Sequence, residues 1–405
     1  MKLKSLPEDF QVLEKTEFKT GHGPFALYRL TKKSIGTPEA IQIVLRHWNL
    51  SRAQVSYGGL KDRHAVTTQY LTLHQGPNRN IEERSFQLEY LGQANRPFGP
   101  HDILANEFQI TLRGIAASRL SGLEHAFKKI GSTGVVNYFD DQRFGSLGVS
   151  GEFIAVPWCQ GNYERALYLA LAEPNTHDRP REKEQKQILR DHWGQWIRCK
   201  ELLDRSHRRS IVTYLCDHPQ DFRRAIALIR NDLRSLYVAA FQSYLWNRWL
   251  SSIIEAALPL ESRETIPSRC GELWVPRAMS PAVEFLQEFE LPLPSARQKA
   301  WPTAWKSQLD LLLEQLNLDT TQIRLKYPRD TFFSKGERRC WLQVPGLTWK
   351  VEEDKQRRGR YTAVLQFELP KGAYATMIVK HFTQVAEEPT IAENEEDCSD
   401  PSIEE

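Results

Sequence analysis

The secondary-structure pattern of the sequence changes twice along its 405 residues, from strand-like to helical and back. This arrangement restricts the folds that the chain can adopt. Residues 1–150 read mainly as strands broken by turns; Phe108, Ile110 and Leu112, for instance, alternate with polar residues as in a half-buried strand. Longer helical patterns follow at 163–172, 181–204, 221–256 and 305–316. Strand-like alternation returns near residue 340. The pattern therefore predicts an α+β domain that is interrupted by a separate, mostly helical domain and then resumes.

Local signals place individual elements. Thr37-Pro38-Glu39 offers an N-cap, a proline at the first helical position and an early acid, which predicts a helix over 38–48. A strand is expected at 68–73, so the segment from Gly58 to Ala65 would be a loop between regular elements. Near the end of the chain, a turn at Lys371-Gly372 is expected to lead into a strand at 374–379.

Composition and cysteine usage exclude several classes of protein. With 40% apolar and 26% charged residues and no run of about 18 apolar residues, the chain reads as a soluble protein with more than one core. Its first residues, MKLKSLPEDF, lack the apolar stretch of a signal peptide, so we expect a cytoplasmic protein. The six cysteines form no C-x-x-C pair, which argues against a zinc site and a disulfide framework. No metal site is expected.

Charge is distributed unevenly. Residues 386–405 hold nine acids and no base, which predicts a disordered acidic tail. The rest of the chain therefore carries a formal charge of +12, although the net charge of the whole is +3. Such a body favours a polyanionic partner such as nucleic acid, although a charged face is also common for solvation alone.

The usual nucleotide and zinc motifs, G-x-G-x-x-G, G-x-x-x-x-G-K-[ST] and H-E-x-x-H, do not occur, which favours a reaction without a cofactor. What remains is a set of short stretches that combine aromatic, amide and basic residues, at 4–10, 58–69, 137–145 and 372–376. Rings stack on a base, amides bond its edge and cationic side chains hold phosphates. The stretches therefore suit a nucleotide that is turned out of its stack.

The stretch G-L-K-D-R-H-A-V-T at 59–67, with Gln69, resembles the signature of the TruD family of tRNA pseudouridine synthases. Further similar blocks follow the family's order: P-E-D-F at 7–10, G-V-x-N-Y-F-x-x-Q-R-F-G at 134–145, S-Y-L-W-N at 243–247, G-E-R-R at 336–339 and L-P-K-G-A-Y-A-T at 369–376. The resemblance covers nearly the whole chain.

This resemblance implies an α+β pseudouridine synthase catalytic domain with a mixed β-sheet, into which a mostly helical TRUD domain is inserted. Together with the two changes of secondary-structure pattern, it predicts four segments. These are the first part of the catalytic domain at 1–160, an inserted TRUD domain at 161–340, the C-terminal part of the catalytic domain at 341–385 and the acidic tail at 386–405. It also implies the reaction, in which a uridine of tRNA, in this family usually uridine 13, is isomerised to pseudouridine without a cofactor. The expected partner is tRNA, with no membrane and no nucleotide cofactor, and the chain is expected to act as a monomer.

The same blocks imply the site residues. Asp62 matches the family's catalytic aspartate, which must be ionised to attack or stabilise the sugar or base; a nearby cation, from Lys4 or a base flanking the loop, would favour that form. The flanking Lys61 and Arg63 are expected to hold phosphates. The expected substrate-binding residues are Phe10, Asn137, Tyr374, Lys4, Phe139 and Arg143.

The chain departs from the family at two places. Residues 96–106 read R-P-F-G-P-H-D-I-L-A-N where the family usually has a basic K-L-x-x-G-x-x-x-G-N run, and Asp140 stands where glycine is common. Without the resemblance, Asp62 would read as a capping or pairing acid of a solvated turn, and Phe10 and Tyr374 as core aromatics. Two functions stay open: the enzyme, and an RNA-binding or tRNA-folding factor on the same scaffold with little or no turnover.

Overall fold

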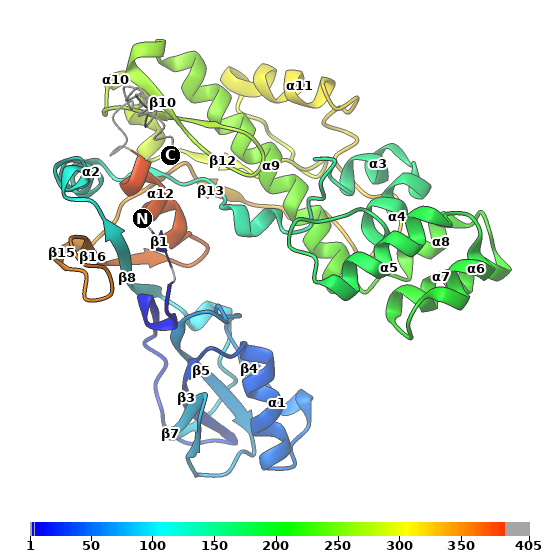
Figure 1. The fold of residues 1–405 in the computed structure, drawn as a ribbon, viewed down its shortest axis with the longest axis horizontal. Coiled ribbons are helices and arrows are strands. Elements are labelled where there is room, and N and C mark those ends of the chain that lie inside the picture. The colour runs from blue at the N-terminus through cyan, green and yellow to red at the C-terminus, as the bar shows by residue number, and fades with distance from the viewer. Residues whose placement is uncertain (1, 4, 385–405) are drawn as a thin grey trace, which may run out of the picture. The chain divides into compact units, whose positions relative to one another are not determined.

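The computed structural model describes residues 2, 3 and 5–384, with the backbone alone for residues 2 and 3 (Figure 1). The chain divides into two compact units, one of Met1–Gly134 with Gln343–Glu405 and one of Val135–Leu342. The predicted acidic tail at 386–405 and the predicted site residue Lys4 lie outside the described residues. None of the described helices is long and apolar enough to cross a lipid bilayer.

The first unit is built on a mixed sheet of ten strands, which confirms the predicted α+β class. Its main path runs β15-β16-β8-β2-β5-β3-β7-β6, while β1 pairs with β8 and β4 with β5. Strands β2 and β5 are parallel, with Gln11 opposite Val66, and the other described pairs are antiparallel. The strands are β1 (Lys2–Leu3), β2 (Phe10–Lys15), β3 (Phe25–Lys33), β4 (Val55–Tyr57), β5 (Val66–His74), β6 (Ile81–Glu83), β7 (Phe86–Ala94), β8 (Ala105–Ile115), β15 (Thr348–Glu353) and β16 (Tyr361–Pro370).

Helix α1 (Thr37–His47) packs on β3, β5 and β7 beside β4 (Figure 1). Its apolar residues Ala40, Ile41 and Val44 recur at helical spacing and are buried in one core with residues of these strands. The helix predicted at 38–48 is therefore present. Thr37 is not its N-cap, however, because the helix already includes Thr37 and the N-cap is Gly36. The Thr37 hydroxyl is used elsewhere, under the loop that carries Asp62.

Helix α12 (Ala375–Gln384) occupies the segment in which the sequence predicts a strand at 374–379, so that prediction is wrong. A short apolar run fits a buried strand or a buried helix equally well, and only its partners decide between them. Here Ala375, Ile378, Val379 and Phe382 form one buried helical face, and α12 packs on α2 (Leu120–Thr133).

The second unit is mostly helical and contains three small two-stranded sheets among the described residues. Its helices are α3 (Ala155–Gln160), α4 (Tyr163–Leu171), α5 (Pro180–Asp191), α6 (Trp196–Leu202), α7 (His207–Asp217), α8 (Phe222–Ala227), α9 (Asn231–Ala257), α10 (Pro281–Glu284) and α11 (Lys306–Glu314). Its strands are β9 (Val135–Val136), β10 (Arg263–Ile266), β11 (Leu273–Pro276), β12 (Glu290–Pro292), β13 (Glu337–Arg339) and β14 (Trp341–Leu342).

Two of the long predicted helices are each divided in two. The pattern at 181–204 forms α5 and α6, separated by a turn in which Gly194 has φ +88°, a conformation that favours glycine. The pattern at 221–256 forms α8, which Asp221 caps by accepting from the Arg224 N–H, and the 27-residue α9. Helical periodicity thus identified the helices but not the breaks between them.

The compact units divide at 134/135 and 342/343, whereas the sequence predicts divisions at 160/161 and 340/341. The difference at the first boundary follows from pairing between β9 and β14, in which Val136 lies opposite Trp341 and Val135 opposite Leu342. The chain therefore enters and leaves the second unit through two adjacent strands. The first helix after β9 is α3, which begins about 20 residues later. Hydrophobic periodicity therefore changes later in the chain than the compact unit does.

Candidate active site

Asp62 lies half-buried on the loop that connects β4 to β5 in the first unit. The loop passes close to a neighbouring segment, because a Cβ atom at Gly58 would lie 2.4 Å from Ile103 Cδ1. Only glycine tolerates such an approach without a shift of the surroundings. On the other side of Asp62, its Oδ1 accepts a hydrogen bond from the His64 N–H at 3.3 Å.

Buried polar side chains of neighbouring elements hold the backbone of this loop by hydrogen bonds. Gln69 Nε2 donates to the Gly59 carbonyl at 3.1 Å, and Gln69 Oε1 accepts from the Thr37 hydroxyl at 2.7 Å. Thr37 Oγ1 in turn accepts from the Lys61 N–H at 3.1 Å. Lys32 Nζ donates to the Asp62 carbonyl at 2.6 Å. Because Thr37 and Gln69 are fully buried and Lys32 is 1% exposed, the loop is fixed to rigid elements on both sides of Asp62.

Lys32 was not singled out by the sequence, in which it is one of two lysines at the end of a strand. Burial lowers the pKa of its ammonium to about 8, against the partly compensating attraction of the Asp62 and Glu39 carboxylates. Lys32, a residue of β3 that the sequence analysis did not name, therefore places an ammonium group close to Asp62.

The two bases that flank Asp62 lie in different environments. Lys61 Nζ forms an ion pair with Glu14 Oε2 at 2.9 Å and a hydrogen bond with Asn106, and its side chain is mostly buried. The expectation that Lys61 holds phosphates is wrong, because its charge is engaged by a fully buried carboxylate. Arg63 is exposed and pairs with Glu39 at 3.0 Å, an arrangement that solvent screens and that can open.

Phe10 and Tyr374 also belong to the first unit. Phe10, the first residue of β2, is 5% exposed, and its ring meets Phe108 edge to face at 6.1 Å between centroids. Tyr374 lies half-buried just before α12 and accepts the Met377 N–H with its carbonyl at 3.0 Å. Phe10 thus sits where core packing alone would place it, while Tyr374 is only half-buried.

The remaining predicted site residues lie in the second unit, where Asn137 is tied to β13. Asn137 Nδ2 donates to the Arg339 carbonyl at 2.9 Å, and Asn137 Oδ1 accepts from the Arg338 guanidinium at 2.6 Å. Arg338 also donates from Nε to the Asn137 carbonyl at 2.9 Å. Asn137 therefore has a structural role in the fold of this unit, whatever else it contacts.

Phe139 lies at the centre of an aromatic and cationic cluster. The Arg338 guanidinium lies 4.2 Å from the centroid of its ring and the Arg143 guanidinium 5.8 Å, while Trp246 meets it edge to face at 5.5 Å. Asn247 of α9 holds the Phe139 backbone at both ends, since it accepts from the N–H and donates to the carbonyl, each at 2.8 Å. The block S-Y-L-W-N thus supports the block N-Y-F.

Arg338 is the second residue that the sequence analysis did not assign. It stands in the G-E-R-R block, so the signal was present, but nothing in the block distinguishes Arg338 from Arg339. The structure does: Arg338 is half-buried, with its guanidinium over the rings of Phe139 and Trp246. Arg339, by contrast, is exposed and pairs with Glu290 at 3.3 Å.

The segment at 96–106, where the chain departs from the family, is closed by hydrogen bonds among its own residues. Both terminal guanidinium nitrogens of Arg96, Nη1 and Nη2, donate to the Asp102 carboxylate, with Nη1 and Oδ2 2.9 Å apart. The same Oδ2 accepts from the Gly99 N–H at 2.8 Å. The hydrogen bond from Arg96 lowers the pKa of Asp102. The charge of Arg96 is thus paired with the Asp102 carboxylate of the same segment.

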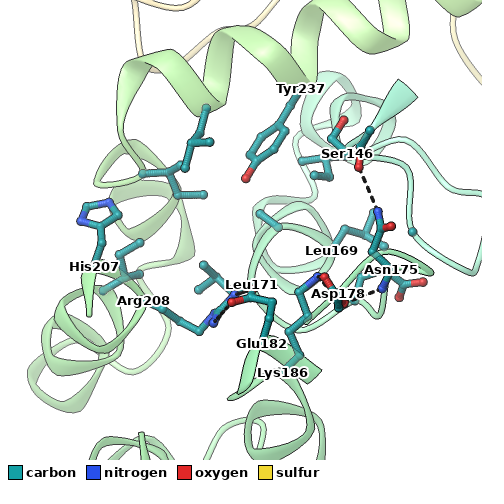
Figure 2. A pocket seen from close by; sticks show the side chains of 18 of the residues that line it. Ser146, Leu169, Leu171, Asn175, Asp178, Glu182, Lys186, His207, Arg208 and Tyr237 are labelled. Carbon is teal, nitrogen blue, oxygen red and sulfur yellow. Dashed lines mark hydrogen bonds and ion pairs between the residues drawn. The ribbon is translucent and has the colours of Figure 1, made fainter. Parts of the chain in front are cut away.

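A cavity of about 510 Å³ lies within the second unit (Figure 2). Its apolar lining comes from residues such as Leu169 and Leu171, and Tyr237 projects from α9 toward it (Figure 2). Ion pairs Asp178–Lys186 and Glu182–Arg208 lie at its wall, so the charges there largely neutralise one another. None of the predicted site residues that the structure describes lines this cavity.

Within the described part of the chain, no group of three or more His, Cys, Asp or Glu side chains is arranged to hold a metal ion. The five cysteines that the structure describes are free thiols.

Comparison with known proteins adds independent evidence. The family model for tRNA pseudouridine synthase D (TruD) matches residues 1–382. A protein of Methanococcus maripaludis named "Probable tRNA pseudouridine synthase D 1" is 30% identical over 393 residues, which cover 94% of this chain and 98% of the relative. A protein of Methanocaldococcus jannaschii named "Probable tRNA pseudouridine synthase D 2" is 30% identical over 390 residues, covering 94% and 91%.

A crystal structure attributed to tRNA pseudouridine synthase D (TruD) of Methanosarcina mazei has the same fold. Its TM-score is 0.72 at 24% identity, and the match covers 94% of this chain and 93% of that one. Because the family model spans nearly the whole described sequence and the relatives match almost end to end, the chain belongs to the TruD family of tRNA pseudouridine synthases.

Proposed function

We propose that this isomerase converts a uridine of tRNA, at position 13, to pseudouridine, with Asp62 as the nucleophile. The observation that carries the proposal is the loop of Asp62: buried side chains hold its backbone on both sides of a half-buried carboxylate. A group held in this way can meet a reacting atom with little loss of orientation, which is the main requirement for a nucleophile without a cofactor.

The reaction balances with the atoms of the nucleotide and the carboxylate alone. The bond between ribose C1′ and uracil N1 breaks, while Asp62 attacks or stabilises the sugar or the base. Uracil then turns, a bond forms between C1′ and C5, the C5 proton leaves to solvent and N1 gains a proton. Asp62 is released unchanged, so no metal ion or redox cofactor enters the balance.

We further propose that the rings of Tyr374 and Phe10 contact the target nucleotide. Tyr374 is half-buried, whereas Phe10 is 5% exposed, so contact of Phe10 with a nucleotide requires its neighbours to move. Asn137 Nδ2 has a second hydrogen besides the one that Arg339 accepts, and it can donate to a nucleotide. We also propose Phe139, Arg143 and Lys4 as substrate-binding residues. The enzyme would act as a monomer in the cytoplasm.

Asp62→Asn tests the proposal, because it keeps the size of the side chain and removes its charge. We expect pseudouridine formation to disappear while tRNA binding and the melting temperature stay close to those of the wild type. Asp62→Glu should lose about 100-fold in rate, since about 1 Å of misplacement has that effect. Glu89→Gln is the control, since it removes an exposed carboxylate of the same unit that pairs with Arg29 and should retain full activity.

The measurement is single-turnover release of tritium from tRNA labelled at uridine C5, followed by mapping of the modified position. Wild-type turnover by a folded Asp62→Asn variant would exclude Asp62 as the nucleophile. Binding of tRNA without any turnover by the wild type would favour the RNA-binding factor instead, and modification at another position would exclude uridine 13.

A further inference from the structure

A polar group is buried where an apolar core would be expected, at the end of the face that α1 covers. Strand β3 presents Ala26, Tyr28 and Leu30 to this face, all fully buried, and then Lys32 with 1% exposure. Next to it Thr37 and Gln69 are also fully buried. Burial of such groups opposes folding unless they are hydrogen-bonded, and burial of a charge opposes it most.

The bonds of these three side chains lead to one place. Three hydrogen bonds join these side chains to the backbone of four consecutive loop residues, 59–62. Lys32 bonds the backbone of Asp62, Thr37 that of Lys61 and Gln69 that of Gly59. Thr37 and Gln69 also bond one another. The cluster therefore determines the path of the loop backbone through the residue whose carboxylate we propose as the nucleophile.

We propose that Lys32 is a positioning residue for catalysis: its ammonium holds the Asp62 carbonyl and thereby directs the Asp62 carboxylate. The inference rests on the proposed role of Asp62. Lys32 itself does not meet the substrate, because its side chain is 1% exposed and its ammonium is bonded to the Asp62 carbonyl. The charged groups that act on Lys32 are the carboxylates of Asp62 and Glu39, which favour its protonated form, and the ammonium of Lys61, which opposes it.

A purely structural role predicts a different result from a positioning role. If Lys32 served stability, its loss would lower the melting temperature and affect activity only through unfolding. A buried ammonium, however, can often be replaced by an apolar side chain of similar length with no loss of stability. The positioning role therefore predicts that Lys32→Met melts at or above the wild-type temperature at pH 7, while kcat falls about 10- to 100-fold and KM for tRNA stays within about threefold.

The neighbouring lysine provides a matched control. Lys33 follows on the same strand, but its side chain points to the opposite face, where it is about half exposed and pairs with Glu8. Lys33→Met removes the same charge from the same strand and should leave kcat unchanged. Equal kcat for Lys32→Met and the wild type, with both folded, would overturn the proposal.

The pH profile and a titration extend the test to the case in which Lys32→Met does not fold. The kcat of the wild type should fall above about pH 8, and a folded Lys32→Met should lack this limb. In ¹³C-lysine NMR spectra, Lys32 should titrate at lower pH in Asp62→Asn than in the wild type, because the variant lacks a carboxylate that favours the ammonium. An unchanged titration of Lys32 would also overturn the proposal.

Failure of this inference is distinguishable from failure of the proposed function. An active, folded Asp62→Asn variant would remove the proposed nucleophile and, with it, the basis of the positioning role. An inactive Asp62→Asn variant together with a fully active Lys32→Met variant would remove only the role of Lys32.

Discussion

Arg338 illustrates how a single side chain can join distant parts of the second unit. Its guanidinium bonds Asn137 at the side chain and at the carbonyl, across 201 positions of sequence, and lies over the rings of Phe139 and Trp246. Charged hydrogen bonds in partly buried sites contribute about 1.5–3 kcal/mol, and cation–π contacts add about 0.5–2 kcal/mol.

We therefore expect Arg338→Met to lower the free energy of unfolding by about 2–4 kcal/mol. Arg339→Met is the control, because Arg339 is exposed and forms a screened pair with Glu290; it should change the free energy by less than about 0.5 kcal/mol. Urea unfolding followed by tryptophan fluorescence measures both. Similar losses in the two variants would contradict the role given to Arg338.

Lys32 predicts a pH-dependent stability whose sign follows from its depressed pKa. The pKa is about 8 in the folded protein and about 10.4 in an unfolded chain. Between these values the unfolded state binds more protons, so the wild type gains stability relative to Lys32→Met as the pH rises, by up to about 3 kcal/mol. Below pH 8 the difference should be constant. Urea unfolding of both proteins at pH 7, 8, 9 and 10 tests this, and a difference that does not vary with pH would contradict it.

At the scale of elements, the segment 96–104 shows a local structure that compensates for an unusual sequence. Asp102 closes it by accepting from Arg96 and Gly99, and the Asp102 carbonyl accepts from the Thr16 hydroxyl at 2.6 Å. Phe98, which is 1% exposed, anchors the segment in the core of the first unit. This segment is thus ordered by its own contacts.

We expect Asp102→Asn to lower the free energy of unfolding by about 1 kcal/mol at pH 7, because it removes the charge from these hydrogen bonds. The folded pKa of Asp102 is lowered, so its contribution is complete above the unfolded value of about 3.9 and is lost as the pH falls through the folded value. Unfolding of both proteins at pH 7 and at pH 3 checks the sign. A difference that is larger at pH 3 than at pH 7 would contradict it.

At the scale of the whole molecule, the relevant quantity is charge. The body of the chain carries +12, and each phosphate contact adds about 0.7–0.9 to the slope of log affinity against log salt. We expect tRNA binding to weaken steeply between low and physiological salt, with a slope that corresponds to several contacts. Fluorescence anisotropy with labelled tRNA measures the slope. The same measurement on Lys33→Met shows how the slope responds to the loss of one positive charge in a variant whose kcat is expected to be normal. A flat response would contradict the electrostatic argument.

The sequence by itself determined the family, the α+β class and the identity of the candidate nucleophile. It could do so because the information is local: Asp62 stands within nine consecutive residues of a motif, and alternation and helical spacing are properties of neighbouring residues. The helix at α1 and the strands β5 and β8 followed from the same kind of signal.

The tertiary structure alone decided which faces meet. Residues 374–379 fit a strand or a helix until α2 provides a partner for a helical face. Lys61 and Lys32 look alike in the sequence as bases near a loop, yet Lys61 turns to Glu14 and Lys32 to the Asp62 carbonyl, 30 positions away. Nor does the G-E-R-R block show which arginine reaches Asn137. These outcomes depend on strand pairing and burial between residues far apart in the chain, and no local pattern encodes them.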